Sequence, residues 1–312
     1  MRKSLAIAFT ILLAIAAIFY LFPQEKNQQE SYPTTNRTPA QQAGTIFKPY
    51  DPSGSATLTG IGTSWFPGAN SIWGATGRDD RGHIWLGISA TGDTPPHLYE
   101  FDPGTGSFTN HGDPVTALKE NGLHRQEENK VKLHSKIVSM DEGWLYFASM
   151  DESGENADGS RLPTWGSHLW RYRPSADHWE HLFAAPEGLI AVSGVGRWVY
   201  ALGYWDHVLY QYDTRTGETR QVRVGSEGGH ISRNLVADSN GHVYVPRVRY
   251  FDLPVTEAES AGSERLLVVT LIEYDQHLNK LQGTPLIHYA GKGKPEGSHG
   301  ITSLIYLADG SI

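Results

Sequence analysis

The sequence has no cysteine and no excess of positive charge, and each of these deficits removes a class of protein. Its 312 residues include no Cys, which excludes disulfide scaffolds, Cys-ligated zinc and thiol nucleophiles. The formal net charge is -8, whereas nucleic-acid-binding proteins normally carry a basic face. We therefore expect no nucleic-acid partner, and His is left as the residue type most able to carry a metal site.

The sequence also lacks the short motifs that indicate the commonest enzymatic and metal-binding functions. The sequence has no P-loop, no HExxH, no GxSxG and no EF-hand loop, which are the local signatures of phosphate binding, zinc proteolysis, hydrolase nucleophiles and calcium binding. What it has in excess is glycine: 34 of 312 residues, or about 11% against about 7% in average proteins. This composition favours a turn-rich β protein.

The N-terminus carries a long uncharged apolar run. Residues 4–22 follow Arg2 and Lys3 and as a helix would span about 28 Å, close to the thickness of a bilayer core. Either a cleaved signal peptide or an uncleaved signal anchor would fit. The run exceeds the usual signal-peptide core and lacks a small-x-small cleavage site after it, which favours the anchor. We thus expect a transmembrane helix at 1–22, a disordered Gln/Asn/Thr/Pro-rich tether at 23–44, and a folded part at 45–312 on the periplasmic or extracellular side.

One pattern recurs through this folded part: an apolar strand, an Asp/Asn-Gly turn, then an aromatic-rich strand. Such turns between alternating strands indicate β-hairpins. The copies lie at 80–87, 141–147, 195–201 and 238–245, and a further one begins at 308–312.

A second pattern, a strand with a turn and an outer strand, follows each of the first four copies. It reads His97-Leu98-Tyr99-Glu100-Phe101-Asp102 in the first unit and recurs at 168–174, 208–217 and 271–275. The two patterns together give four strands per unit. The turn glycines, at 82, 143, 196, 241 and 310, repeat every 45 to 69 residues. Four-stranded units at this spacing predict an all-β protein with the β-propeller fold.

These motifs resemble the blades of virginiamycin B lyase, NHL and gluconolactonase-type propellers. The resemblance rests on Asp-x-Gly-x-Ile-Trp followed by Leu-Tyr-x-Phe-Asp-x-x-Thr-Gly and covers about Tyr50 to Ile312. It implies the fold, and propellers host many activities. The segment Tyr50–Gly54 echoes the outer-strand motif and would close the ring. A ring of six or seven blades needs more chain than this, so we expect a C-terminally truncated sequence.

Up-and-down topology predicts where a site would lie. We label the strands of a blade A to D, with A innermost. The A–B turns then share one face, and the long B–C and D–A loops crowd the opposite face, where loops carry function. Three histidines from separate units fall near the starts of A strands on that face, where they could bind a divalent metal or act as bases: His134, His230 and His299.

Cationic and aromatic residues accompany these histidines on the same face. Guanidinium and ammonium groups would suit a carboxylate or phosphate ligand, and exposed aromatic rings would stack on a sugar. The candidates are Lys136, Arg233, Arg247, Arg249, Tyr204, Trp205 and His207.

Two functional classes fit this arrangement. The first is a membrane-tethered extracytoplasmic propeller that binds an anionic, uronate-like carbohydrate or similar small ligand at the channel mouth. If it is an enzyme, a lyase is the expected type, with a His base and Arg groups that hold the carboxylate. The second is a non-catalytic interaction module that presents one face to a protein partner. Convergence of His134, His230 and His299 would distinguish the first class from the second.

Overall fold

The computed structural model describes residues 66–92, 94–129, 131–156, 159–227, 234–252, 265–286, 301, 303–307 and 309–312. The predicted anchor (1–22), the predicted tether (23–44) and the outer strand expected at Tyr50–Gly54 lie outside the described residues. Within the described ranges, no helix is both long and apolar enough to cross a membrane.

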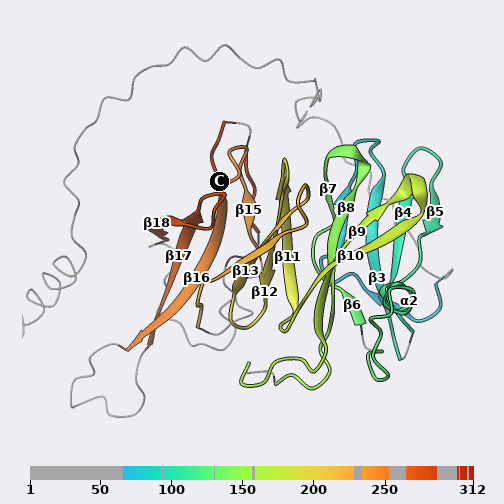
Figure 1. Cartoon of the computed structure of the whole chain (residues 1–312), viewed down its shortest axis with the longest axis horizontal. Helices are drawn as coiled ribbons and strands as arrows, with labels where there is room; N and C mark the ends of the chain where they lie inside the picture. Colours follow the sequence, from blue (N-terminus) through green and yellow to red (C-terminus); the bar gives the residue numbers. More distant parts are fainter. Residues whose placement is uncertain are drawn as a thin grey trace, which may run out of the picture. The chain divides into compact units, whose positions relative to one another are not determined.

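The described strands form four antiparallel sheets, which follow one another along the chain (Figure 1). We call them blades 1 to 4. Blade 1 contains β1 (Ala69–Ser71), β2 (Thr76–Arg78), β3 (Ile84–Ala90), β4 (His97–Asp102) and β5 (Ser107–Asn110). Blade 2 contains β6 (Val131–Leu133), β7 (Val138–Ser139), β8 (Leu145–Asp151), β9 (Gly166–Arg173) and β10 (His178–Ala185). Blade 3 contains β11 (Leu189–Val195), β12 (Trp198–Gly203), β13 (Val208–Asp213) and β14 (Thr219–Arg223), and blade 4 contains β15 (Val236–Ala237), β16 (Val243–Asp252), β17 (Arg265–Tyr274) and β18 (Lys280–Pro285).

Each blade is an up-and-down meander, as the sequence predicted. Strands pair in chain order, and in blades 1 and 2 the first strand is split into two short segments that both pair with the second strand. The A–B and C–D turns therefore lie at one end of every sheet, which we call the turn face. The B–C and D–A connections lie at the other end, which we call the loop face. The all-β architecture of four-stranded blades is confirmed, and a total of six or seven blades stays a prediction.

The A–B turns of blades 1 and 4 have the same local structure. Gly82 and Gly241 take φ values of 88° and 83°, a left-handed conformation that glycine adopts without steric cost. In both turns an Asp side chain accepts from the backbone N–H that follows the glycine: Asp79 from His83 and Asp238 from His242, each at 2.9 Å. The recurring Asp-x-x-Gly-His sequence is thus explained by one hydrogen-bonded turn.

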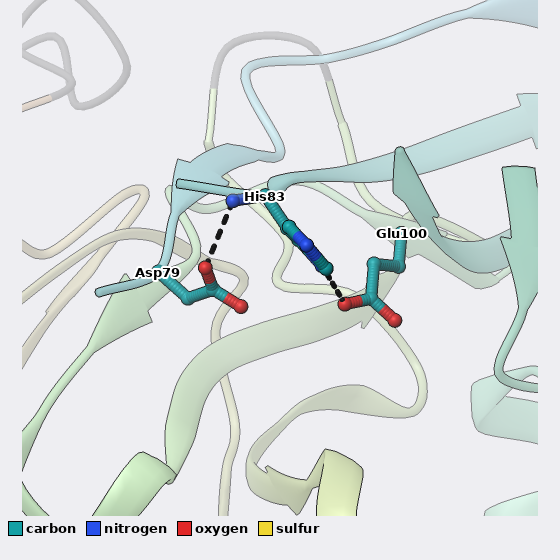
Figure 2. A group of neighbouring side chains, drawn as sticks. All are labelled: Asp79, His83 and Glu100. Atoms are coloured by element: carbon teal, nitrogen blue, oxygen red, sulfur yellow. Dashed lines mark hydrogen bonds and ion pairs between the residues drawn. The ribbon is translucent and has the colours of Figure 1, made fainter. Parts of the chain in front are cut away.

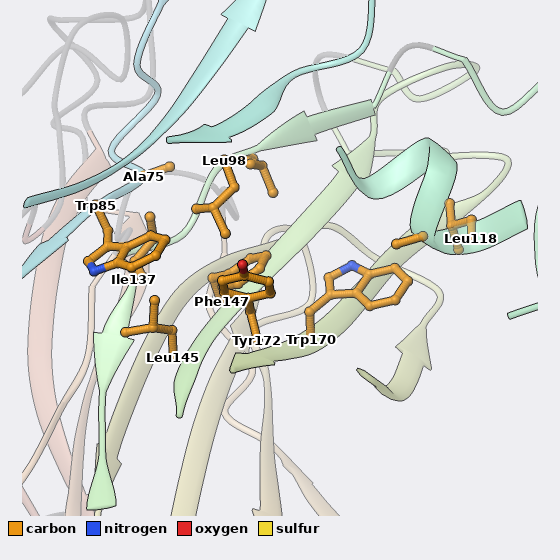
Figure 3. Packing of buried hydrophobic residues seen from close by; sticks show 11 residues of the cluster. Ala75, Trp85, Leu98, Leu118, Ile137, Leu145, Phe147, Trp170 and Tyr172 are labelled. Atoms are coloured by element: carbon orange, nitrogen blue, oxygen red, sulfur yellow. The ribbon is translucent and has the colours of Figure 1, made fainter. Parts of the chain in front are cut away.

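The core consists of layers between successive blades. The layer between blades 1 and 2 contains the fully buried Trp85 and Trp170 (Figure 3). A large aromatic side chain buries roughly 200 Å², which at about 25 cal/mol/Å² gives about 5 kcal/mol per ring before entropy is counted. The helix α2 (Pro114–Glu120) lies in the D–A connection of blade 1, is capped by Asp113, and adds Leu118 to this layer. Two further clusters join blade 2 to blade 3 and blade 3 to blade 4.

Candidate functional site

The structure describes one of the three predicted histidines. His134 follows β6, at the loop-face half of the split first strand of blade 2, and is 8% exposed. His230 and His299, and with them Arg233, lie outside the described residues. Convergence of the three imidazoles at a metal therefore stays a prediction.

His134 belongs to a cluster with an aromatic ring and a cation. Its imidazole is stacked on the indole of Trp73, with 6.2 Å between ring centroids and 12° between planes. The Nζ of Lys132 lies 4.5 Å from the centroid of the same ring and forms an ion pair with Glu152. Trp73 remains 44% exposed, so much of its surface is open to solvent. We call Trp73, Lys132, His134 and Glu152 the Trp73 cluster.

A pocket of about 190 Å³ opens beside this cluster. One of its walls holds Ser89, which is 5% exposed and whose Oγ has no hydrogen-bond partner among the residues that the structure describes. A buried hydroxyl without a partner is costly, so a ligand hydroxyl or carboxylate that reached it would gain a hydrogen bond. The lining is mostly small and polar: Asn70, Trp73, Ser89, Ala90, Gly92, Thr94, Asn129, Val131 and Lys132. We call it the loop-face pocket.

The predicted aromatic candidates of blade 3 lie in a packed loop. Trp205 is 7% exposed and donates from Nε1 to Glu155 at 3.1 Å, while the Tyr204 ring lies edge-on to it at 4.7 Å. His207 is fully buried. Burial raises the pKa of Glu155 despite the Trp205 hydrogen bond that lowers it.

A buried carboxylate, Glu187, holds this loop in place. It precedes β11, is 1% exposed, and accepts from the backbone N–H groups of Trp205, Asp206 and Val208 at 2.9, 2.9 and 3.1 Å. Burial is the largest influence on the pKa of Glu187 and raises it, although the three N–H donors oppose this. The loop is therefore fixed by one side chain that the sequence did not single out.

The remaining predicted cations lie apart in the described structure. Lys136 is exposed between β6 and β7. Arg247 and Arg249 both lie on β16, where Arg249 is exposed and Arg247 is partly buried. The Nε of Arg247 is buried and has no hydrogen-bond partner within the described part of the chain. No described contact joins these two arginines to His134.

A metal-competent group lies on the turn face of blade 1. Asp79, His83 and Glu100 place one ligand atom each within 4.8 Å of one another, and Figure 2 shows His83 between the two carboxylates. Protein groups already contact all four carboxylate oxygens. Arg81 donates to Asp79 at 2.7 Å and to Glu100 at 2.6 Å, and His111 contacts the second oxygen of Glu100 at 3.0 Å. The guanidinium of Arg81 thus supplies the positive charge that a metal would bring.

The same arrangement recurs in blade 4, which favours a structural role for it. Asp238 receives the His242 N–H, and His242 Nδ1 lies 2.8 Å from Glu273. Tyr244 then donates to Asp238 at 3.3 Å, as Trp85 donates to Asp79 at 3.1 Å. The sequence carries a signal for this arrangement, because the two described blades that have His after the turn glycine also have Glu in the third strand.

Comparison with known proteins assigns the chain to no family. No protein-family model matches the chain, and no curated protein matches it. Solved structures of propeller proteins resemble it. They include regucalcin, a calcium-binding protein from Agrobacterium tumefaciens, with 16% identity over 67% of this chain and 59% of that one and a TM-score of 0.36. TolB from Acinetobacter baumannii has 14% identity over 70% of this chain and 44% of that one, with a TM-score of 0.41. A luciferin-regenerating enzyme has 10% identity over 65% of this chain and 58% of that one, with a TM-score of 0.38. The chain thus spans less than two thirds of each of these proteins.

Proposed function

We propose that this protein is a membrane-tethered, extracytoplasmic propeller that binds a small anionic ligand, a uronate-bearing carbohydrate, in the loop-face pocket. The observation that carries the proposal is the Trp73 cluster, in which a half-exposed indole lies beside an ammonium group at the pocket wall. The apolar run at 4–22 supports the tether and the extracytoplasmic location.

The chemistry of the pocket suits a sugar acid. An exposed indole offers an apolar surface to a sugar ring, while Asn70, Ser89 and Asn129 offer hydrogen bonds to its hydroxyls. Lys132 already pairs with Glu152, but an ammonium has three donor hydrogens and can serve a ligand carboxylate as well. Lyase-type turnover would further require a base at the proton α to that carboxylate. We propose His134, whose imidazole is stacked on Trp73 at the edge of the pocket, as that base.

Binding of glucuronate to the full-length chain in detergent, measured by calorimetry with glucose as the uncharged comparator, tests the proposal. We expect glucuronate to bind more tightly than glucose, and Lys132→Ala to remove roughly a tenfold preference, the worth of one charged hydrogen bond. Trp73→Ala should weaken both sugars. Lys119→Ala, at an exposed lysine on α2, is the matched control. Equal binding of the two sugars, or an unchanged preference in Lys132→Ala, would refute the proposal.

A further inference from the structure

Blade 2 departs from the charge pattern of the other described blades. At two equivalent positions near the end of the third strand, the other blades have an acid or amide followed by an acid: Glu100 and Asp102, Gln211 and Asp213, Glu273 and Asp275. In blade 2 these positions are Arg171 and Arg173. The other blades form the same fold with acids or an amide at these positions, so the fold itself does not require the two arginines. Their presence in blade 2 alone therefore points to a local role.

The two arginines are held by an aromatic ring and by an acid. Trp144 occupies the position of His83 and His242, and the guanidinium carbons of Arg171 and Arg173 lie 4.2 and 5.0 Å from its ring centroid. Glu180 accepts two hydrogen bonds from Arg171, both at 2.8 Å. These contacts fix the Arg171 guanidinium, so little of its conformational freedom is left to lose when a ligand binds.

A pocket of about 210 Å³ lies on the turn face, where blade 2 meets blade 3. Its polar lining comes from the turns of both blades, and it is walled on one side by Trp144. Its charged and aromatic lining residues are Asp141, Glu142, Trp144, Arg171, Arg197 and Arg215. We call it the arginine pocket.

Two further arginines line the same pocket. Arg197 is paired with Asp213 and lies over Trp198, 4.8 Å from its centroid. Arg215 is exposed, and none of the described residues forms an ion pair with it. The carboxylates of Asp141 and Glu142 also line the pocket, so its specificity depends on where the guanidinium donors point, not on net charge alone.

We propose that the arginine pocket is a second ligand site, which binds the carboxylate or phosphate group of a small anion. Planar guanidinium groups bind both oxyanions through paired N–H···O bonds. Arg171 and Arg197 are held by Glu180 and Asp213, which do not line the pocket. The side chain of Arg215, which forms no described ion pair, would bind the ligand directly. The site lies on the opposite face from the loop-face pocket, and it stands independently of the function proposed above.

Titration of the 312-residue chain in detergent with inorganic phosphate and with citrate, at constant ionic strength, tests this site. We expect saturable binding of at least one probe, weakened roughly tenfold by Arg215→Ala. Arg171→Gln installs the residue that blade 3 has at this position and should weaken binding as well. Arg220→Ala, at an exposed arginine of β14, should leave it unchanged.

The two probes separate the two ligand chemistries. Binding of phosphate alone identifies a phosphate site, and binding of citrate alone identifies a carboxylate site. Saturable binding of neither probe at tens of millimolar, or the same affinity in Arg215→Ala as in the unmodified chain, would overturn the proposal. Because Arg215 is exposed and forms no described ion pair, its replacement tests the site even if the Arg171 variant does not fold.

Discussion

The Nδ1 of His83 lies 2.5 Å from Oε1 of Glu100, which ties the first turn of blade 1 to its third strand. The equivalent pair in blade 4, His242 and Glu273, is 2.8 Å apart. In blade 2 a tryptophan takes the place of the histidine and an arginine that of the glutamate, with the guanidinium over the ring. In blades 1, 2 and 4 the residues at these two positions therefore change together, because they touch across neighbouring strands. In blade 3 Arg197 pairs instead with Asp213, two residues beyond the equivalent position.

Glu100 should be important for stability because three groups depend on its carboxylate. Arg81, His83 and His111 all contact it, and Glu100→Gln would remove the charge and present an NH₂ group to donors. We expect a loss of roughly 1–3 kcal/mol in the free energy of unfolding, measured by urea denaturation. Glu120→Gln, at an exposed position at the end of α2, should change it little. Equal stability of the two variants would contradict the prediction.

Removal of Glu187 should loosen the blade 3 loop. Glu187→Ala leaves one buried N–H group, of Trp205, and two partly buried ones, of Asp206 and Val208, without their acceptor. A fully buried group left so costs about 1–3 kcal/mol. Hydrogen exchange of the amides of Trp205, Asp206 and Val208 should accelerate more than that of the blade 2 core. Glu127→Ala, at an exposed carboxylate, should leave these amides protected, and slow exchange in both variants would count against the assignment.

His181 should make the protein sensitive to acid. Burial, together with the charge of His168, lowers the pKa of His181 to about 4, below its ordinary value of about 6.5. A lowered pKa means that the folded state prefers the neutral ring. The free energy of folding that the neutral His181 ring contributes is present in full above about pH 6.5 and is lost as the pH falls through about 4. The loss is about 1.4 kcal/mol per pH unit, or roughly 3 kcal/mol in all.

Thermal unfolding between pH 7 and pH 4 measures this effect. The unmodified chain should lose more stability over that range than His181→Gln. His277→Gln, at an exposed histidine, should follow the unmodified chain. If the unfolding temperatures of the unmodified chain and of His181→Gln fall in parallel with pH, protonation of His181 is not the cause of the acid sensitivity.

Close approach of blades 1 and 2 makes Gly77 intolerant of a side chain. A Cβ at this position would lie 2.1 Å from the backbone oxygen of Ile137 in the neighbouring blade, and backbone cannot move away as a side chain can. We expect Gly77→Ala to cost about 1–3 kcal/mol or more. At the exposed Gly104, the nearest atom to a new Cβ is the side-chain oxygen of Asp102 at 3.1 Å, which can rotate. Chemical denaturation of the two variants should separate them clearly.

The sequence alone determined the all-β architecture, the four strands per blade and the two faces. These follow from local rules: turn glycines such as Gly82 and Gly241 take conformations that few other residues adopt, and antiparallel neighbours joined by short turns must alternate in direction. The candidate residues were less predictable. His134 was singled out by its place in a repeat, but Trp73 and Lys132 lie in different segments and gave no common signal.

Tertiary structure decided which side chains meet. Ser89, Lys132 and Trp73 line one pocket because the second strand of blade 1 lies next to the first strand of blade 2. Arg171, Arg197 and Arg215 line another because blades 2 and 3 pack against each other. A repeat pattern records contacts within one blade, since these recur with its period. Contacts between blades join residues far apart in sequence, and the packing of whole sheets, rather than any local spacing, brings them together.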